Sequence, residues 1–219
     1  MREPRSKLLA ATLVSFALST SATLSDTWAP PGEWSHRSRG QQFRFKVFPR
    51  VLSSAADYWR EDDRGPHKRG QMAGKQGVCI GQLEKRTADG SYVVIWKREL
   101  VNDVSPVTAL VTADGSHVVT FDNWHSQGFG ADVVVIYGLE GKLVASLGLA
   151  DFLPMEQIAK LPRGVSSILW GGEHHFDETE QYLVLQVVAE KRSDGEDRTG
   201  WHSVVIALTD GRVQTSDGK

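Results

Sequence analysis

The residues best suited to chemistry lie in a polar, glycine-containing segment, residues 122–132, which includes Asp122, Asn123, Trp124 and His125. Aspartate and asparagine offer the oxygen ligands that a hard cation such as calcium prefers. A tryptophan beside a histidine can line a ligand pocket. The spacing does not match an EF-hand, so we take these four residues as a candidate binding site and predict no metal ion and no cofactor. The alternative is a packed loop in which Asp122 and Asn123 bond backbone groups.

A second constellation contains the adjacent histidines His174 and His175, followed by Asp177. Histidines beside a carboxylate suggest a zinc site or a general base. Neighbouring residues on a strand point to opposite faces, so both histidines could bind one metal only from a loop. The zinc-protease motif HExxH is absent. These three residues are the weaker alternative site, and a solvated charged turn is the simpler interpretation.

Motifs of several enzyme classes are missing from the sequence. Gly128 and Gly130 precede a predicted strand, whereas a dinucleotide fingerprint opens a helix. The glycines in residues 65–70 are followed by Gln71, where a phosphate loop needs lysine. The nucleophile elbow GxSxG is also absent. We therefore expect a binding or protein-interaction module, with a protein or a glycan as its ligand.

The alternative function is a hydrolase outside the cytoplasm, with or without a metal, that uses His125 or the pair His174 and His175.

The overall charge does not favour nucleic acid as a partner. The chain of 219 residues has 25 Lys and Arg against 27 Asp and Glu, a formal charge of −2, and a nucleic-acid binder needs a basic excess. The single cysteine, Cys79, excludes an internal disulfide framework.

The N-terminus resembles a secretory signal. A basic start precedes an apolar run at residues 8–18, and small residues follow it to Ala22. The run is too short to cross a bilayer, which takes about 20 residues. We predict that residues 1–22 are a signal peptide and that the protein is exported to the periplasm or the outside, with no membrane span.

The remaining chain predicts one all-β domain over residues 41–219, after an extended lead-in at residues 23–40 that contains adjacent prolines. A long loop is expected at residues 53–77, where mixed charges and glycines interrupt the apolar pattern. One short helix is expected at residues 154–161, with prolines at both ends.

Apolar runs and short turns predict the strands. Strands are expected at residues 42–48, 79–86, 91–98, 107–111, 117–122, 133–137, 142–147, 165–169, 182–188, 204–208 and 212–215. Turns containing Gly90, Gly115, Gly141 and Gly211 join four pairs of them as hairpins. Valine is frequent in these runs, as expected of β-branched residues in sheets.

The order of strands repeats, and two turn phrases, VVVIYGLEGKLV and SVVIALTDGRVQ, are alike. Each repeated unit is expected to form a four-stranded antiparallel meander. Over residues 78–215 the chain therefore resembles β-propeller repeat proteins. The resemblance implies two to three blades, too few to close a ring. The chain would then either assemble with copies of itself as a homo-oligomer or pack its sheets as an open stack or β-sandwich.

Overall fold

The computed structural model describes residues 29–52, 77–188 and 200–214. Most of it is strand, arranged as three four-stranded antiparallel sheets, and one α-helix is present in these residues. The expected all-β class is confirmed. The predicted signal peptide, and the predicted long loop up to residue 76, lie outside the described residues.

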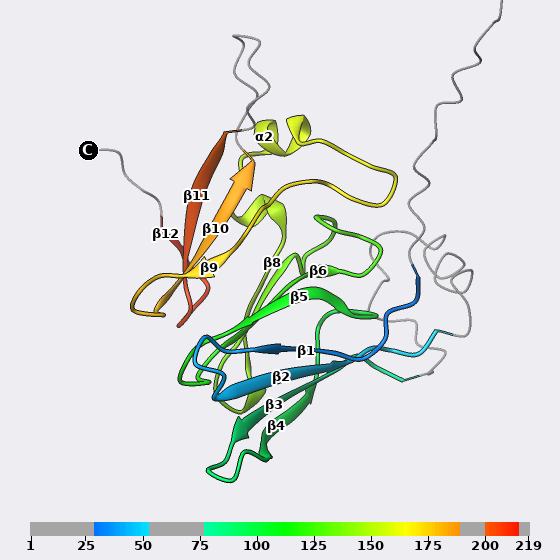
Figure 1. The fold of residues 1–219 in the computed structure, drawn as a ribbon. Coiled ribbons are helices and arrows are strands. Elements are labelled where there is room, and N and C mark those ends of the chain that lie inside the picture. Colours follow the sequence, from blue (N-terminus) through cyan, green and yellow to red (C-terminus); the bar gives the residue numbers. More distant parts are fainter. Residues whose placement is uncertain (1–28, 53–76, 189–199, 215–219) are drawn as a thin grey trace, which may run out of the picture.

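Each sheet is a meander whose strands follow one another along the chain (Figure 1). Sheet 1 contains β1 (Trp34–Arg37), β2 (Phe43–Phe48), β3 (Ile80–Arg86) and β4 (Tyr92–Glu99). Sheet 2 contains β5 (Pro106–Val111), β6 (Val118–Asn123), β7 (Val134–Tyr137) and β8 (Leu143–Leu147). Sheet 3 contains β9 (His175–Phe176), β10 (Tyr182–Val188), β11 (Trp201–Ala207) and β12 (Val213–Gln214).

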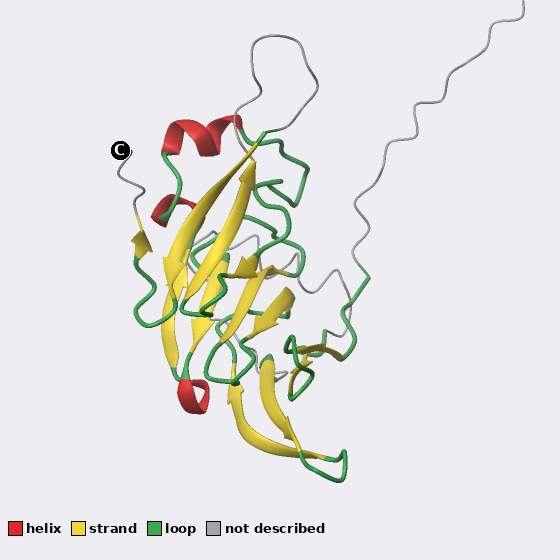
Figure 2. Ribbon diagram, turned by 60° about the vertical axis from the view of Figure 1, so that its left-hand side comes forward, coloured by secondary structure: helices red, strands yellow, loops and turns green. Residues whose placement is uncertain are grey.

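The helical segments lie towards the ends of the strands (Figure 2). They are the 3-10 turns η1 (Leu139–Gly141) and η2 (Leu149–Asp151) and the helix α2 (Met155–Lys160), which matches the helix expected at residues 154–161. Within the described ranges, no helix is long and apolar enough to cross a membrane.

Sheet 2 is the middle layer, because its two central strands bury both faces. Along β7, Val134 and Ile136 pack in the core shared with sheet 3, whereas Val135 and Tyr137 pack in the core shared with sheet 1. Strands buried on both faces read as continuous apolar runs, which explains the Val-rich sequence of this region. The three sheets therefore pack in series, and the described strands close no ring of blades.

The four predicted turn glycines all have positive φ, between 70° and 84°. Gly141 is also tightly packed: a Cβ atom at this position would lie 2.7 Å from the ring of Trp96 on β4. Glycine thus lets the turn before β8 press against sheet 1.

Two features differ from the expected strands. Residues 165–169 are not a strand: Ile168 packs in the core, but Ser167 and Ile168 make only isolated bridges, and Val165 is 92% exposed. The first strand of sheet 3 is instead β9, in the segment that we interpreted as a charged turn. In addition, the expected lead-in at residues 23–40 contains β1, which pairs with β2 as an edge strand.

Candidate functional site

The segment that follows β6 holds the four candidate binding residues, and three of them are buried. Asn123 is 7% exposed, Trp124 5% and His125 6%. The Asn123 side-chain oxygen accepts a hydrogen bond from Asn102 at 3.0 Å. The Trp124 indole N–H donates to the carbonyl of Ala29 at 3.0 Å, which ties the lead-in to sheet 2. These three side chains are buried, and Asn123 and Trp124 each form a hydrogen bond to another segment of the chain.

Asp122 is the candidate residue with the most unusual environment. Its backbone is left-handed, with φ of 55°. Its Oδ1 accepts hydrogen bonds from the Gly128 amide at 2.7 Å and from the Trp170 indole N–H at 3.0 Å. Burial raises the pKa of Asp122 to about 6, because a carboxylate loses its hydration there, and nearby Asp132 raises it further.

Trp170 contacts a residue of each candidate site, although the two sites lie far apart in the sequence. The face of its indole stacks on the imidazole of His174, with ring centroids 4.8 Å apart, and Phe121 stacks on His174 at 4.7 Å. His174 therefore lies close to the indole that binds the carboxylate of Asp122, although 52 residues separate the two in sequence. Both belong to one packed cluster between sheets 2 and 3.

The environment of His174 does not suit a general base. Its Nδ1 accepts a hydrogen bond from the Gln186 amide at 3.3 Å, so the neutral ring carries its proton on Nε2. Burial between the two aromatic rings lowers the pKa of His174 to about 4, with a further lowering from His175. The lone pair that a base requires is thus already in use, and the hydrolase alternative gains no support at His174.

The remaining candidates are separated from this cluster. His175 is exposed on β9. Asp177 accepts hydrogen bonds from Thr179, Gln181 and Tyr182, which closes the turn before β10. Across the ranges that the structure describes, no three His, Cys, Asp or Glu side chains converge as metal ligands.

The face of sheet 1 that points away from sheet 2 was not predicted as a site. Cross-strand register places five basic and two acidic side chains on this cationic face. They are Arg37 on β1; Arg44 and Lys46 on β2; Glu84 and Arg86 on β3; and Lys97 and Glu99 on β4. A chain with a formal charge of −2 thus carries a local basic excess on one sheet face.

Aromatic rings and Glu84 fix several of these cations in place. The Nζ atoms of Lys46 and Lys97 lie 4.9 and 5.1 Å from the centre of the Phe48 ring. The Arg44 guanidinium lies 3.9 Å from the centre of the Tyr92 ring and donates to Glu84 at 2.7 Å. Because these three cations are held against rings or a buried carboxylate, they lose less side-chain entropy when an anion binds.

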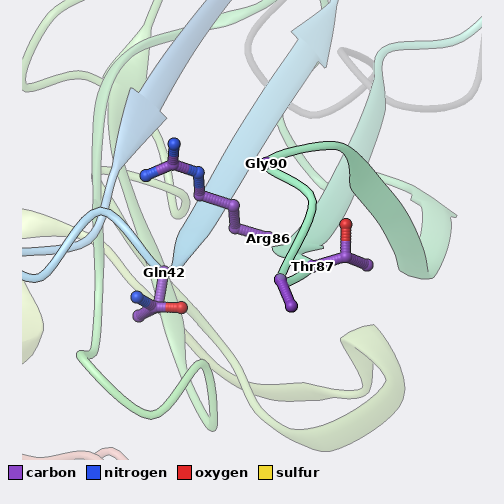
Figure 3. A pocket seen from close by; sticks show the side chains of 5 residues that line it. Gln42, Arg86, Thr87 and Gly90 are labelled. Atoms are coloured by element: carbon purple, nitrogen blue, oxygen red, sulfur yellow. The ribbon is translucent and has the colours of Figure 1, made fainter.

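One end of the cationic face opens into a cavity of about 350 Å³ lined by Gln42, Arg86, Thr87, Ala88 and Gly90 (Figure 3). The Thr87 hydroxyl is already hydrogen-bonded to the carboxylate of Asp89. The guanidinium of Arg86 is therefore the group in this cavity that can attract an anion, and it extends the cationic face rather than forming a separate site.

The signal for this face was present in the sequence as the alternation of Arg44 and Lys46 with apolar residues. That alternation identified a half-buried strand but did not show what its polar side binds.

Comparisons of the chain with family models, curated proteins and solved structures gave no match.

Proposed function

We propose that this protein is an exported binding module whose cationic face recognises an anionic glycan, a sugar chain bearing carboxylate or sulfate groups. The observation that carries the proposal is the excess of five basic over two acidic side chains on the outer face of sheet 1, with Arg44, Lys46 and Lys97 held by rings or by Glu84. Export is proposed from the pattern of residues 1–22.

The spacing of the cations favours an extended ligand over a single small anion. Arg44 and Lys46 are two residues apart on β2, a separation of about 7 Å, and Lys97 lies two strands away, roughly 10 Å across the sheet. A ligand with several regularly placed anions can contact such an array at more than one point. Each ionic contact at this exposed surface is weak by itself. A ligand with repeating charges therefore gains affinity by making several such contacts at once.

A glycan is favoured over nucleic acid because the basic excess is a local one on a sheet face of a chain whose formal charge is −2. Nucleic acid binding relies on strong basic fields that neutralise many phosphates. The remaining acidic residues of this chain oppose such a field. A shorter or less densely charged sugar chain needs only the local array.

The proposal is tested by titrating the purified protein with a sulfated, a carboxylated and a neutral oligosaccharide of equal length in a calorimeter. The charged ligands should bind and the neutral one should not, and binding should weaken as salt is added because exposed charges are screened. The two charged ligands distinguish sulfate from carboxylate recognition.

A matched pair of variants locates the site. Lys97→Gln removes an exposed lysine of the cationic face, and Lys142→Gln removes an exposed lysine that precedes β8. Loss of one charged contact worth about 1 kcal/mol weakens binding about fivefold, so Lys97→Gln should show this loss and Lys142→Gln should not. Equal effects of the two substitutions would refute the assignment to sheet 1.

A further inference from the structure

Gln82 is a buried polar residue in the middle of the cationic face. It lies on β3, on the outer face of sheet 1, and is only 9% exposed. The residues directly opposite it are Lys46 on β2 and Lys97 on β4. Buried polar side chains are nearly always hydrogen-bonded, so an acceptor without a partner at this position needs an explanation.

The hydrogen bonds of Gln82 leave its side-chain oxygen without a donor. Its Nε2 donates to Glu84 Oε1 at 2.6 Å. The Glu84 carboxylate also accepts from Arg44 at 2.7 Å and has no proton to donate, so the amide can meet it only through Nε2. Within the described part of the chain, Gln82 Oε1 accepts no hydrogen bond, and it is not sealed from solvent. Glu84 thus fixes the amide with a free acceptor on the cationic face.

The two lysines beside Gln82 share one aromatic ring. Their Nζ atoms lie 4.9 and 5.1 Å from the centre of the Phe48 ring. Phe48 is the diagonal neighbour of Gln82 on β2, at a separation of about 7–8 Å. Neither lysine forms an ion pair with the residues that the structure describes. Two cations without a carboxylate partner and one free acceptor therefore lie close enough for one ligand to contact all three.

We propose that Gln82 is a specificity-determining residue of the cationic face, and that its Oε1 accepts a hydrogen bond from a hydroxyl of the sugar residue whose anionic group is bound by Lys46 and Lys97. This role rests on the proposed function and adds that the ligand carries a hydroxyl donor beside its charge. A uronic acid or a sulfated sugar provides both groups. A polyanion without hydroxyls would satisfy the lysines but would displace water from Gln82 Oε1 without replacing its hydrogen bond, which costs affinity.

Calorimetric titration with two forms of one probe tests the role of Gln82. The first form is a tetrasaccharide of galacturonic acid, and the second has the same free carboxylates but methylated hydroxyls, so that it cannot donate. The wild type should bind the methylated form about fivefold more weakly, the ratio expected from the loss of one hydrogen bond. Gln82→Met keeps the length of the side chain but removes the acceptor. It should weaken binding of the unmodified form by the same factor, leave the methylated form unaffected and so abolish the preference.

Gln186→Met is the matched control. Gln186 also lies on a central strand, β10, and its Nε2 also donates to a neighbouring side chain, that of Ser203 in sheet 3. This substitution should leave both affinities unchanged. A preference for the unmodified form that survives Gln82→Met would mean that the methyl groups only obstruct binding, and it would overturn the proposal. Equal weakening of both forms by Gln82→Met would also overturn it, because the residue would then act only by supporting Glu84.

Failure of the proposed function gives a different result, because the wild type would then bind neither form, which overturns both proposals. Equal binding of the two forms would leave the cationic face as an anion-binding surface and overturn only the role of Gln82. If Gln82→Met fails to fold, the wild type alone is titrated with deoxy forms of the probe, each lacking one kind of ring hydroxyl and adding no bulk. One of these forms should bind about fivefold more weakly than the parent probe, and equal affinity for all of them would refute hydroxyl recognition.

Discussion

Substituting Asp122 by asparagine should change how stability depends on pH. The pKa of this carboxyl is raised from 3.8 to about 6 in the folded protein, so the fold binds its proton more tightly than the unfolded chain does. The resulting stabilisation is complete below pH 3.8 and is lost as pH rises through 6. A shift of about 2 pKa units corresponds to about 3 kcal/mol. Asparagine does not titrate, and its side-chain oxygen can still accept from Gly128 and Trp170.

The free energy of unfolding of the wild type and of Asp122→Asn should be measured in urea at pH values from 3.5 to 7.5. The stability of the variant relative to the wild type should rise by about 3 kcal/mol across this range. His174 provides an internal counterpart, because its pKa is lowered from 6.5 to about 4 and its stabilisation is lost as pH falls from 6.5.

The two titrations oppose each other between pH 4 and 6, so the wild type should vary little there. Asp122→Asn should become acid-sensitive, and His174→Gln should instead gain stability on acidification. A difference between wild type and Asp122→Asn that is constant with pH would refute the assignment of a buried carboxylate with a raised pKa.

Three further outcomes are expected. Gly141→Val should lower the free energy of unfolding by roughly 2 kcal/mol or more, since its Cβ would contact the Trp96 ring at a positive φ, whereas Gly40→Val, with open space around it, should cost much less. Trp124→Ala should destabilise by ~3–5 kcal/mol in the same urea assay, because the ring is buried, and near-wild-type stability would contradict its packing role. Mass spectrometry of exported protein should find an N-terminus near Thr23, and an intact Met1 in cytoplasmic protein would contradict export.

Much of the fold could be predicted because its signals are local. Alternation at residues 43–48 and the glycines of the turns depend on neighbours along the chain, and the structure confirms both. Residues 165–169 contain apolar residues and Ile168 is buried, but the segment makes only isolated bridges, so the prediction of a strand was wrong there. A pattern indicates which residues can be buried but not whether the backbone finds a strand to pair with.

The site was less predictable because it depends on contacts between distant strands. Asp122 and His174 appear unrelated in sequence, and only the indole of Trp170 places them in one cluster. The cationic face likewise requires the register that sets Lys46 of β2 and Lys97 of β4 on either side of Gln82. This register joins residues up to about 50 positions apart, so no local sequence pattern could predict it.

The most direct test of the proposed function is to map where a charged oligosaccharide binds, by following backbone amide NMR shifts during a titration. If sheet 1 recognises the glycan, the largest chemical-shift changes should fall on β2, β3 and β4, at the amides of Lys46, Gln82 and Lys97. A neutral sugar of equal length should leave these amide resonances unchanged. Shifts confined to sheet 3 or to the segment after β6, or equal shifts with the neutral sugar, would contradict it.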